Sequence, residues 1–118
     1  MKIGILGAGG IGSNVAVNLV RSGITNFKIA DFDRIELSNL NRQFYFYDQI
    51  GKPKVQGLKE NLEKIDPSVE IEIIDKKIEK DNIKELFSDC DILVEAFDKK
   101  EYKKLLIEEF YSSNKLIV

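Results

Sequence analysis

An apolar segment that runs directly into a glycine-rich turn, at residues 3–12, constrains the fold of this chain more than any other feature. Its sequence, IGILGAGGIG, is typical of a short strand, a turn and the start of a helix. Gly7 allows a tight turn, Gly9 leaves room for phosphate oxygens, and Gly12 lets the helix pack onto the strand. The helix start offers N–H groups and a positive dipole end to an anion. The segment therefore predicts a nucleotide-binding turn, the alternative being glycines kept only for close packing.

Strands and helices alternate along the rest of the chain. The apolar patterns predict strands over residues 3–6, 27–30, 69–73, 91–97 and 115–118, and helices over residues 11–20, 53–65, 81–87 and 99–113. Such alternation implies a parallel sheet with right-handed crossovers. We therefore predict an α/β fold: a Rossmann-like, doubly wound, mainly parallel sheet in the order 3-2-1-4-5 with helices on both faces. The third strand, which has one polar face, is expected at an edge.

Two acidic residues, Asp31 and Asp33, follow the second predicted strand. Ligands of parallel sheets bind outside the carboxyl ends of the strands, so Asp31 is expected near the glycine turn. It also lies about twenty residues past the last glycine of the motif, where a ribose-binding acid is expected. The alternative is a solvated loop aspartate.

The segment over residues 34–49 has no clean period and contains two asparagines, Arg42 and four aromatic residues. A loop of this length without regular structure is more often functional than not. The alternative is a partly buried aromatic loop that covers one sheet edge, with Arg42 capping backbone carbonyls.

Two lysines, Lys52 and Lys54, flank Pro53 at the start of the second predicted helix. A cation there faces the positive end of the helix dipole and costs about 0.3–1 kcal/mol of helix stability. Unfavourable placements of this kind are expected at functional sites, where a bound anion makes the interaction of the cation with its surroundings favourable. Lys54 is therefore a candidate phosphate-binding residue, the alternative being a surface lysine tolerated at small cost.

Asp98 follows the fourth predicted strand and precedes the last predicted helix. Its position suits a ligand-binding acid at the carboxyl edge of the sheet and equally suits the N-cap of that helix. The nearby Cys90 is expected to be a structural residue.

Composition narrows the classes of function. The 118 residues form about one domain, and 18 basic against 20 acidic residues suggest neither a nucleic-acid nor a membrane-surface partner. The single cysteine and the lack of a signal or membrane-spanning segment predict a cytoplasmic, reduced setting. Without histidine, the chain alone provides neither a structural zinc site of the usual ligands nor histidine catalysis.

Together these residues resemble the adenylating domain of the ThiF/MoeB/HesA family, bacterial relatives of ubiquitin-activating enzymes. The resemblance is carried by the glycine turn, residues 31–33 (DFD), residues 38–43 (SNLNRQ), residues 51–54 (GKPK) and Asp98. It implies that ATP binds with Mg²⁺. The α-phosphate would be attacked by the C-terminal carboxylate of a ubiquitin-like sulfur-carrier protein ending in Gly-Gly, and acyl-adenylate and pyrophosphate would form.

The resemblance also implies roles for single residues. The phosphates would lie on the turn formed by Gly7, Gly9, Gly10 and Gly12, and the ribose would lie on Asp31 with Asp33 as a supporting acid. The triphosphate would be held by Asn39, Arg42 and Lys54, with Gln43 also at the cofactor site, and Asp98 would hold magnesium. The catalytic set would be Arg42, Lys54 and Asp98. These groups suit the chemistry, because charge develops on the phosphates while a carboxylate nucleophile is already ionised.

The chain departs from the family pattern at both ends. It begins at the first strand, without the N-terminal helix whose arginine reaches the partner subunit's site in many relatives. It also stops inside a predicted strand, so we expect residues 1–118 to be the N-terminal part of an ATP-binding adenylation domain. The carrier-binding surface, any zinc motif and any sulfur-handling cysteine would then lie beyond Val118, and the chain alone would turn over weakly or not at all.

The sequence is also compatible with other hypotheses about function. Within the family, the short N-terminus favours a thiamine-type enzyme with a ThiS-like carrier, and a homodimer is possible. Outside it, an NAD(P)- or FAD-binding domain of an oxidoreductase fits the glycine turn and Asp31 equally well. A non-catalytic nucleotide-binding module is a third reading. The adenylation hypothesis requires Arg42, Lys54 and Asp98 to gather at the glycine turn, and a dinucleotide site does not.

Overall fold

Five parallel strands form the central sheet of the computed structural model, which describes residues 1–118. The strands lie in the order β3-β2-β1-β4-β5, and each neighbouring pair is parallel. Their bounds are β1 Ile3–Leu6, β2 Asn26–Ala30, β3 Glu70–Ile74, β4 Ile92–Glu95 and β5 Leu116–Ile117. The predicted fold class and strand order are therefore confirmed, and β3 lies at an edge as its polar face indicates.

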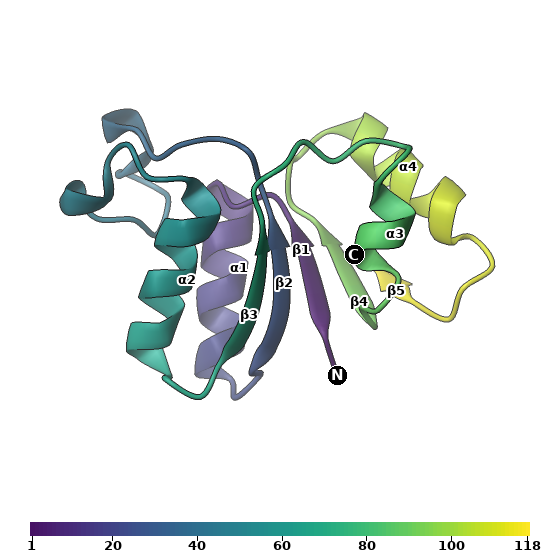
Figure 1. Cartoon of the computed structure of the whole chain (residues 1–118), viewed down its shortest axis with the longest axis horizontal. Helices are drawn as coiled ribbons and strands as arrows, with labels where there is room; N and C mark the ends of the chain where they lie inside the picture. The colour runs from purple at the N-terminus through teal and green to yellow at the C-terminus, as the bar shows by residue number, and fades with distance from the viewer.

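Helices cover both faces of the sheet (Figure 1). One face packs against α1 (Gly10–Arg21) and α2 (Lys54–Ile65), through a core that includes Phe27 and Leu58. The other face packs against α3 (Ile83–Phe87) and α4 (Lys100–Phe110). Because all five strands are parallel, their carboxyl ends lie at the same edge of the sheet, and the loops that follow β1 to β4 gather there.

Several elements are shorter than their sequence patterns predict. The apolar run after Asp91 continues to Phe97, but β4 ends at Glu95, with one more bond to β1 from the Ala96 N–H to the Leu6 carbonyl oxygen at 2.8 Å. Pro53 lies at the N-cap of α2, with ψ of 137°, and not inside its first turn. Its ring fixes φ near the helical value without removing a helical hydrogen bond.

The segment over residues 34–49 contains two short 3₁₀ helices, at Leu37–Asn39 and Tyr47–Gln49. It packs against α1 and α2, and not against a sheet edge as the alternative interpretation expected. The Asn61 side chain of α2 donates to the Phe44 carbonyl (2.8 Å) and exchanges two hydrogen bonds with Gln49. These bonds fix a loop that the sequence pattern leaves undefined.

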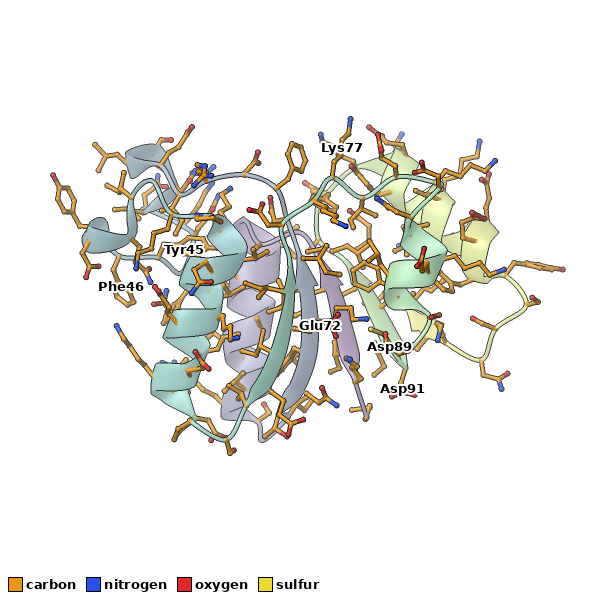
Figure 2. The ribbon with its side chains drawn as sticks, in the orientation of Figure 1. Tyr45, Phe46, Glu72, Lys77, Asp89 and Asp91 are labelled. Atoms are coloured by element: carbon orange, nitrogen blue, oxygen red, sulfur yellow. The ribbon has the colours of Figure 1, made fainter.

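A charged cluster lies between the middle of the sheet and the end of α3. The Nζ atom of Lys28, a buried residue on β2, lies 2.7 Å from Asp89 Oδ1 and 2.6 Å from the Leu86 carbonyl oxygen. Lys2 Nζ also contacts Asp89, at 2.9 Å. Figure 2 shows Asp89 between the sheet and α3, close to Glu72, whose carboxylate also reaches Lys28. This cluster joins β2 and β3 to the end of α3, away from the loops at the carboxyl edge of the sheet.

Two further findings bear on the sequence expectations. Cys90 is fully buried, and burial raises the pKa of its thiol to about 12, so it is not a reactive nucleophile. No helix combines the length and the apolar character needed to cross a membrane.

Candidate functional site

The largest cavity of the chain, of about 670 Å³, opens at the carboxyl edge of the sheet. The loops after β1, β2, β3 and β4 and the start of α2 all contribute to it. In Figure 2 its rim is marked by Lys77, on the loop after β3. The lining consists of Gly7, Gly9, Gly10, Ile11, Asp31, Phe32, Asp33, Arg42, Gln43, Lys54, Lys77, Ala96, Phe97, Asp98, Lys99 and Tyr102.

The glycine turn forms the floor of this cavity. Gly7 has φ of 112°, and a Cβ there would lie 2.7–2.9 Å from the backbone of Ala96 and Phe97, so only glycine fits. A Cβ on Gly9 or Gly10 would meet no atom closer than 3.5 Å, because both residues face the open cavity. No side chain caps the first turn of α1. Its N–H groups are therefore available to an anion in the cavity.

Gly12 is not part of the lining. A Cβ on this residue would lie 1.7 Å from the Gly7 carbonyl oxygen and 3.2 Å from the Ala96 side chain. Its role in this structure is the close packing of α1 onto the turn, as its spacing in the motif predicts.

Asp31 is buried beside the turn with 4% of its surface exposed, so the alternative of a solvated loop aspartate is wrong. Its two carboxylate oxygens accept N–H groups from Ala8 (2.8 Å) and Asp33 (2.9 Å). These bonds orient the carboxylate, and each oxygen retains a lone pair for a further donor. Asp33 lines the cavity as well, and its carbonyl oxygen accepts the Lys54 N–H at 2.9 Å.

The two lysines near the start of α2 have different environments. Lys52 is exposed and pairs with Glu60, its Nζ lying 3.0 Å from Oε1. Lys54 is buried, with 7% of its surface exposed, lines the cavity and forms no ion pair. A buried lysine without a carboxylate partner carries an uncompensated charge that an anionic ligand would stabilise. Lys54 is thus not the surface lysine of the alternative interpretation.

Arg42 and Gln43 line the cavity next to the glycine turn. The Arg42 Nη1 atom donates to the Ser38 carbonyl and to Asn41 Oδ1, both at 3.0 Å, so Arg42 does cap a carbonyl while its side chain stays exposed. Gln43 is buried, and its Oε1 atom has no hydrogen-bond partner. An unpaired buried acceptor beside a cavity indicates a place for a donor from a ligand.

Asp98 lines the cavity from the β4 side and has φ of 57°, the only positive value outside glycine. It is not a helix cap, because the N-cap of α4 is Lys99 and no side chain bonds the first turn there. The exposed carboxylate therefore faces the cavity without the competing role that the sequence allowed.

Asn39 is, with Gly12, one of two predicted site residues that do not line the cavity. It is buried, and its Oδ1 atom accepts the Glu36 N–H at 2.8 Å, which closes a 3₁₀ turn. The Asn39 side chain therefore satisfies a backbone N–H of its own loop, a requirement that the sequence pattern does not reveal.

Seven residues of the lining are absent from the site that the sequence predicts: Ile11, Phe32, Lys77, Ala96, Phe97, Lys99 and Tyr102. Phe97 and Tyr102 stack at a centroid distance of 4.5 Å, and Lys77 and Lys99 lie at the rim. Phe97 and Lys99 follow the end of β4, where the carboxyl-edge rule would have found them. Lys77 belongs to a charged stretch in which no sequence pattern indicates a function. The spacing of Tyr102 predicts a core residue of α4.

The cavity combines three features of distinct chemistry. Backbone N–H groups and the cations Arg42 and Lys54 suit several negative phosphate charges, the oriented Asp31 suits hydroxyl donors, and the Asp98 carboxylate suits a hard cation. These residues come from the segments that follow β1, β2 and β4, and they meet only in the folded chain.

Comparisons with known proteins agree on one family. Residues 1–118 match the family described as the ThiF family. The chain is 35% identical over 106 residues to the molybdopterin-synthase adenylyltransferase of Haemophilus influenzae, covering 89% of the chain and 44% of that protein. It is 33% identical over 95 residues to the sulfur carrier protein adenylyltransferase of Thermus thermophilus, covering 80% of the chain and 35% of that protein.

Among solved structures, the tRNA N6-threonylcarbamoyladenosine dehydratase TcdA of E. coli in complex with AMP gives a TM-score of 0.92 at 28% identity. The match covers 99% of this chain and 49% of that one. A structure of the same protein in complex with ATP gives a TM-score of 0.91. The chain thus spans less than half the length of these relatives.

Proposed function

Because the chain belongs to the ThiF family, we propose that it forms the nucleotide-binding part of an adenylyltransferase. This enzyme uses ATP to activate the C-terminal carboxylate of a ubiquitin-like sulfur-carrier protein. One observation carries the proposal: Arg42, Lys54 and Asp98, from separate segments, line one cavity with the glycine turn. A dinucleotide cofactor needs the turn and an acid such as Asp31 but none of these three residues. The observation therefore favours a nucleoside triphosphate over NAD(P) or FAD.

In this proposal each part of the cavity binds one part of ATP. The N–H groups at Gly9 and Gly10 and the start of α1 bind phosphate oxygens, and Asp31 accepts hydrogen bonds from the ribose hydroxyls. Asp33 supports this end of the site, and Gln43 accepts a donor from the ligand. Asn39 and Gly12 act indirectly, since neither lines the cavity.

The reaction proposed is attack of a carrier carboxylate oxygen on the α-phosphorus of ATP. A new P–O bond forms to the carboxylate, and the bond between the α-phosphorus and the bridging oxygen of the leaving pyrophosphate breaks. Arg42 and Lys54 offset the negative charge that builds on the α-phosphate and the departing pyrophosphate. No general base is required, because the carboxylate is ionised at neutral pH.

We propose that Asp98 holds Mg²⁺ beside the phosphates. No three carboxylate, cysteine or histidine side chains gather closely enough to cage a metal ion. Mg²⁺ is commonly held by one or two carboxylates together with substrate phosphates, and this donor set fits Asp98 at a phosphate-binding cavity. When bound, the ion would supply additional neutralisation of phosphate charge.

The finer features of the protein follow as further parts of the proposal. The carrier is ThiS-like and ends in Gly-Gly, the pathway is thiamine biosynthesis, and the setting is the cytoplasm, in keeping with one cysteine and no disulfide. Residues 1–118 are the N-terminal part of the adenylation domain. A homodimer would bury exposed aromatic residues such as Phe46 (Figure 2), which is 50% exposed.

Calorimetric titration tests the nucleotide-binding part of this proposal. The chain is expected to bind Mg²⁺-ATP more tightly than NAD, and Arg42→Ala and Lys54→Ala are expected to weaken ATP binding. Lys52→Ala is the matched control, because Lys52 lies two residues away and pairs with Glu60 outside the cavity. Tighter binding of NAD, or ATP binding unchanged by both site variants, would reject the proposal.

The adenylation step is tested on the intact protein by exchange of labelled pyrophosphate into ATP. Exchange is expected only when a Gly-Gly-ended carrier is present, and a panel of thiamine-type and molybdopterin-type carriers identifies the pathway. Because TcdA is a structural neighbour that acts on tRNA according to its name, tRNA bearing threonylcarbamoyladenosine forms a third arm. If only this tRNA supported exchange, the substrate would be an RNA and not a carrier protein.

A further inference from the structure

Two polar side chains on the second turn of α1 hold the loop that contains Arg42. The Asn14 Nδ2 atom donates to the Arg42 carbonyl oxygen at 2.8 Å, and the Ser13 Oγ atom accepts the Phe44 N–H at 3.1 Å. The same two side chains also reach back to the turn. Asn14 Nδ2 lies 2.7 Å from the Gly10 carbonyl oxygen, and Ser13 Oγ lies 2.6 Å from that of Gly9.

These bonds join two parts of the cavity that are distant in sequence. Gly9 and Gly10 belong to the glycine turn, whereas Arg42 and Phe44 belong to the loop before α2. The bond from Asn14 spans 28 residues of sequence and fixes the backbone from which the Arg42 side chain extends. The Arg42 guanidinium is held separately, through Ser38 and Asn41. Asn14 thus ties the Arg42 backbone to the first turn of α1, next to the glycine turn.

Asn14 is exposed, so it contributes little to the core. Its amide makes no contact with a core residue through these two bonds, both of which end on backbone carbonyls at the cavity. Its two partners are instead the residues that flank the space proposed for the phosphates.

We propose that Asn14 is a positioning residue for Arg42, which sets the guanidinium against the glycine turn before the nucleotide binds. This inference rests on the proposed function, since it concerns the phosphate end of the ATP site. Pre-organisation of this kind lowers the cost of ordering a loop on binding. The effect of Asn14 should therefore appear with phosphorylated ligands and should require Arg42.

A double-mutant cycle tests the inference on the 118-residue chain. Dissociation constants of Mg²⁺-ATP and of adenosine are measured for the wild type, Asn14→Ala, Arg42→Ala and the double variant. Asn14→Leu is a second variant of similar size that lacks the donor. Asn18→Ala is the matched control, because Asn18 is an exposed asparagine one turn further along α1 and outside the cavity. Thermal unfolding of each variant is recorded in parallel.

Loss of one such hydrogen bond is expected to weaken Mg²⁺-ATP binding about three- to tenfold in both Asn14 variants. Adenosine binding and the unfolding temperature should stay at their wild-type values, and Asn14→Ala should add nothing in the Arg42→Ala background. Full additivity of the two substitutions, equal loss of adenosine and ATP binding, or wild-type affinity in both Asn14 variants would overturn the inference. If the wild type itself fails to bind ATP, the proposed function fails as well.

Discussion

The Tyr45 hydroxyl donates a hydrogen bond to the Ala8 carbonyl oxygen, which fastens the loop before α2 directly to the glycine turn. The Ala8 N–H is held from its other side by Asp31 Oδ2 at 2.8 Å. One residue of the turn is thus held at both of its backbone polar groups. Burial, aided by the nearby Asp31 charge, raises the pKa of Tyr45 far above its usual value. The phenol is therefore protonated at neutral pH and acts as a donor.

Tyr45→Phe should destabilise the chain by about 1–3 kcal/mol, because it leaves the buried Ala8 carbonyl without its donor. The ring still packs against the core, so the loss reports the hydroxyl. Urea unfolding measures the change, with Tyr47→Phe as the control, since Tyr47 is 76% exposed two residues away. Equal unfolding free energies for the two variants would contradict the proposed importance of this bond.

Asp98→Ala should be less stable than Asp98→Gly by about 1 kcal/mol, although alanine is usually the more stabilising residue. The reason is the φ of 57° at this position, which glycine adopts without a Cβ penalty. Both variants remove the cavity carboxylate, so both should lose the Mg²⁺ dependence of ATP binding. Thermal unfolding and titration with and without Mg²⁺ measure the two effects separately. An alanine variant as stable as the glycine variant would show that the backbone at Asp98 is not strained.

The Asp89 carboxylate should contribute stability that is lost in acid. Hydrogen bonds from Lys28 first and then Lys2 hold the pKa of Asp89 well below its usual range. Its contribution is therefore complete above the unfolded-state pKa of about 4 and disappears as the pH falls toward the lower folded-state value. Asp89→Asn should destabilise the chain at pH 7, and the difference from wild type should shrink below about pH 4.

Urea midpoints at pH 7, 5 and 3 measure this dependence. Asp48→Asn, at an exposed residue in no ion pair, is the matched control. A wild-type advantage that stays constant from pH 7 to pH 3 would show that the Lys28–Asp89 pair does not respond to acid in the expected way.

The sequence pattern predicts the sheet order and the position of Asp31, because periodicity and the carboxyl-edge rule depend on short segments. It also indicates that Lys54 is unusual, since its charge opposes the helix dipole. It does not distinguish Lys54 from Lys52, because burial of one and pairing of the other depend on the folded loop. The bond that Asn39 makes is hidden from the sequence for the same reason: its amide satisfies a backbone group that only the 3₁₀ turn creates.

The glycines of the turn should separate into two classes when each is replaced by alanine. In Gly12→Ala the added Cβ would lie 1.7 Å from the Gly7 carbonyl oxygen, a backbone atom that cannot move without shifting β1 or α1. We expect the free energy of unfolding to fall by about 3 kcal/mol or more, which is typical of severe overpacking in a close helix–strand contact. In Gly9→Ala the nearest atom, Gln43 Nε2, lies 3.5 Å from the Cβ, so the fold should persist. That methyl group would instead occupy space proposed for phosphate oxygens and weaken Mg²⁺-ATP binding. Unfolding by urea and calorimetric titration distinguish the two classes, and a stable Gly12→Ala variant, or a Gly9→Ala variant with wild-type affinity for ATP, would contradict this division of roles.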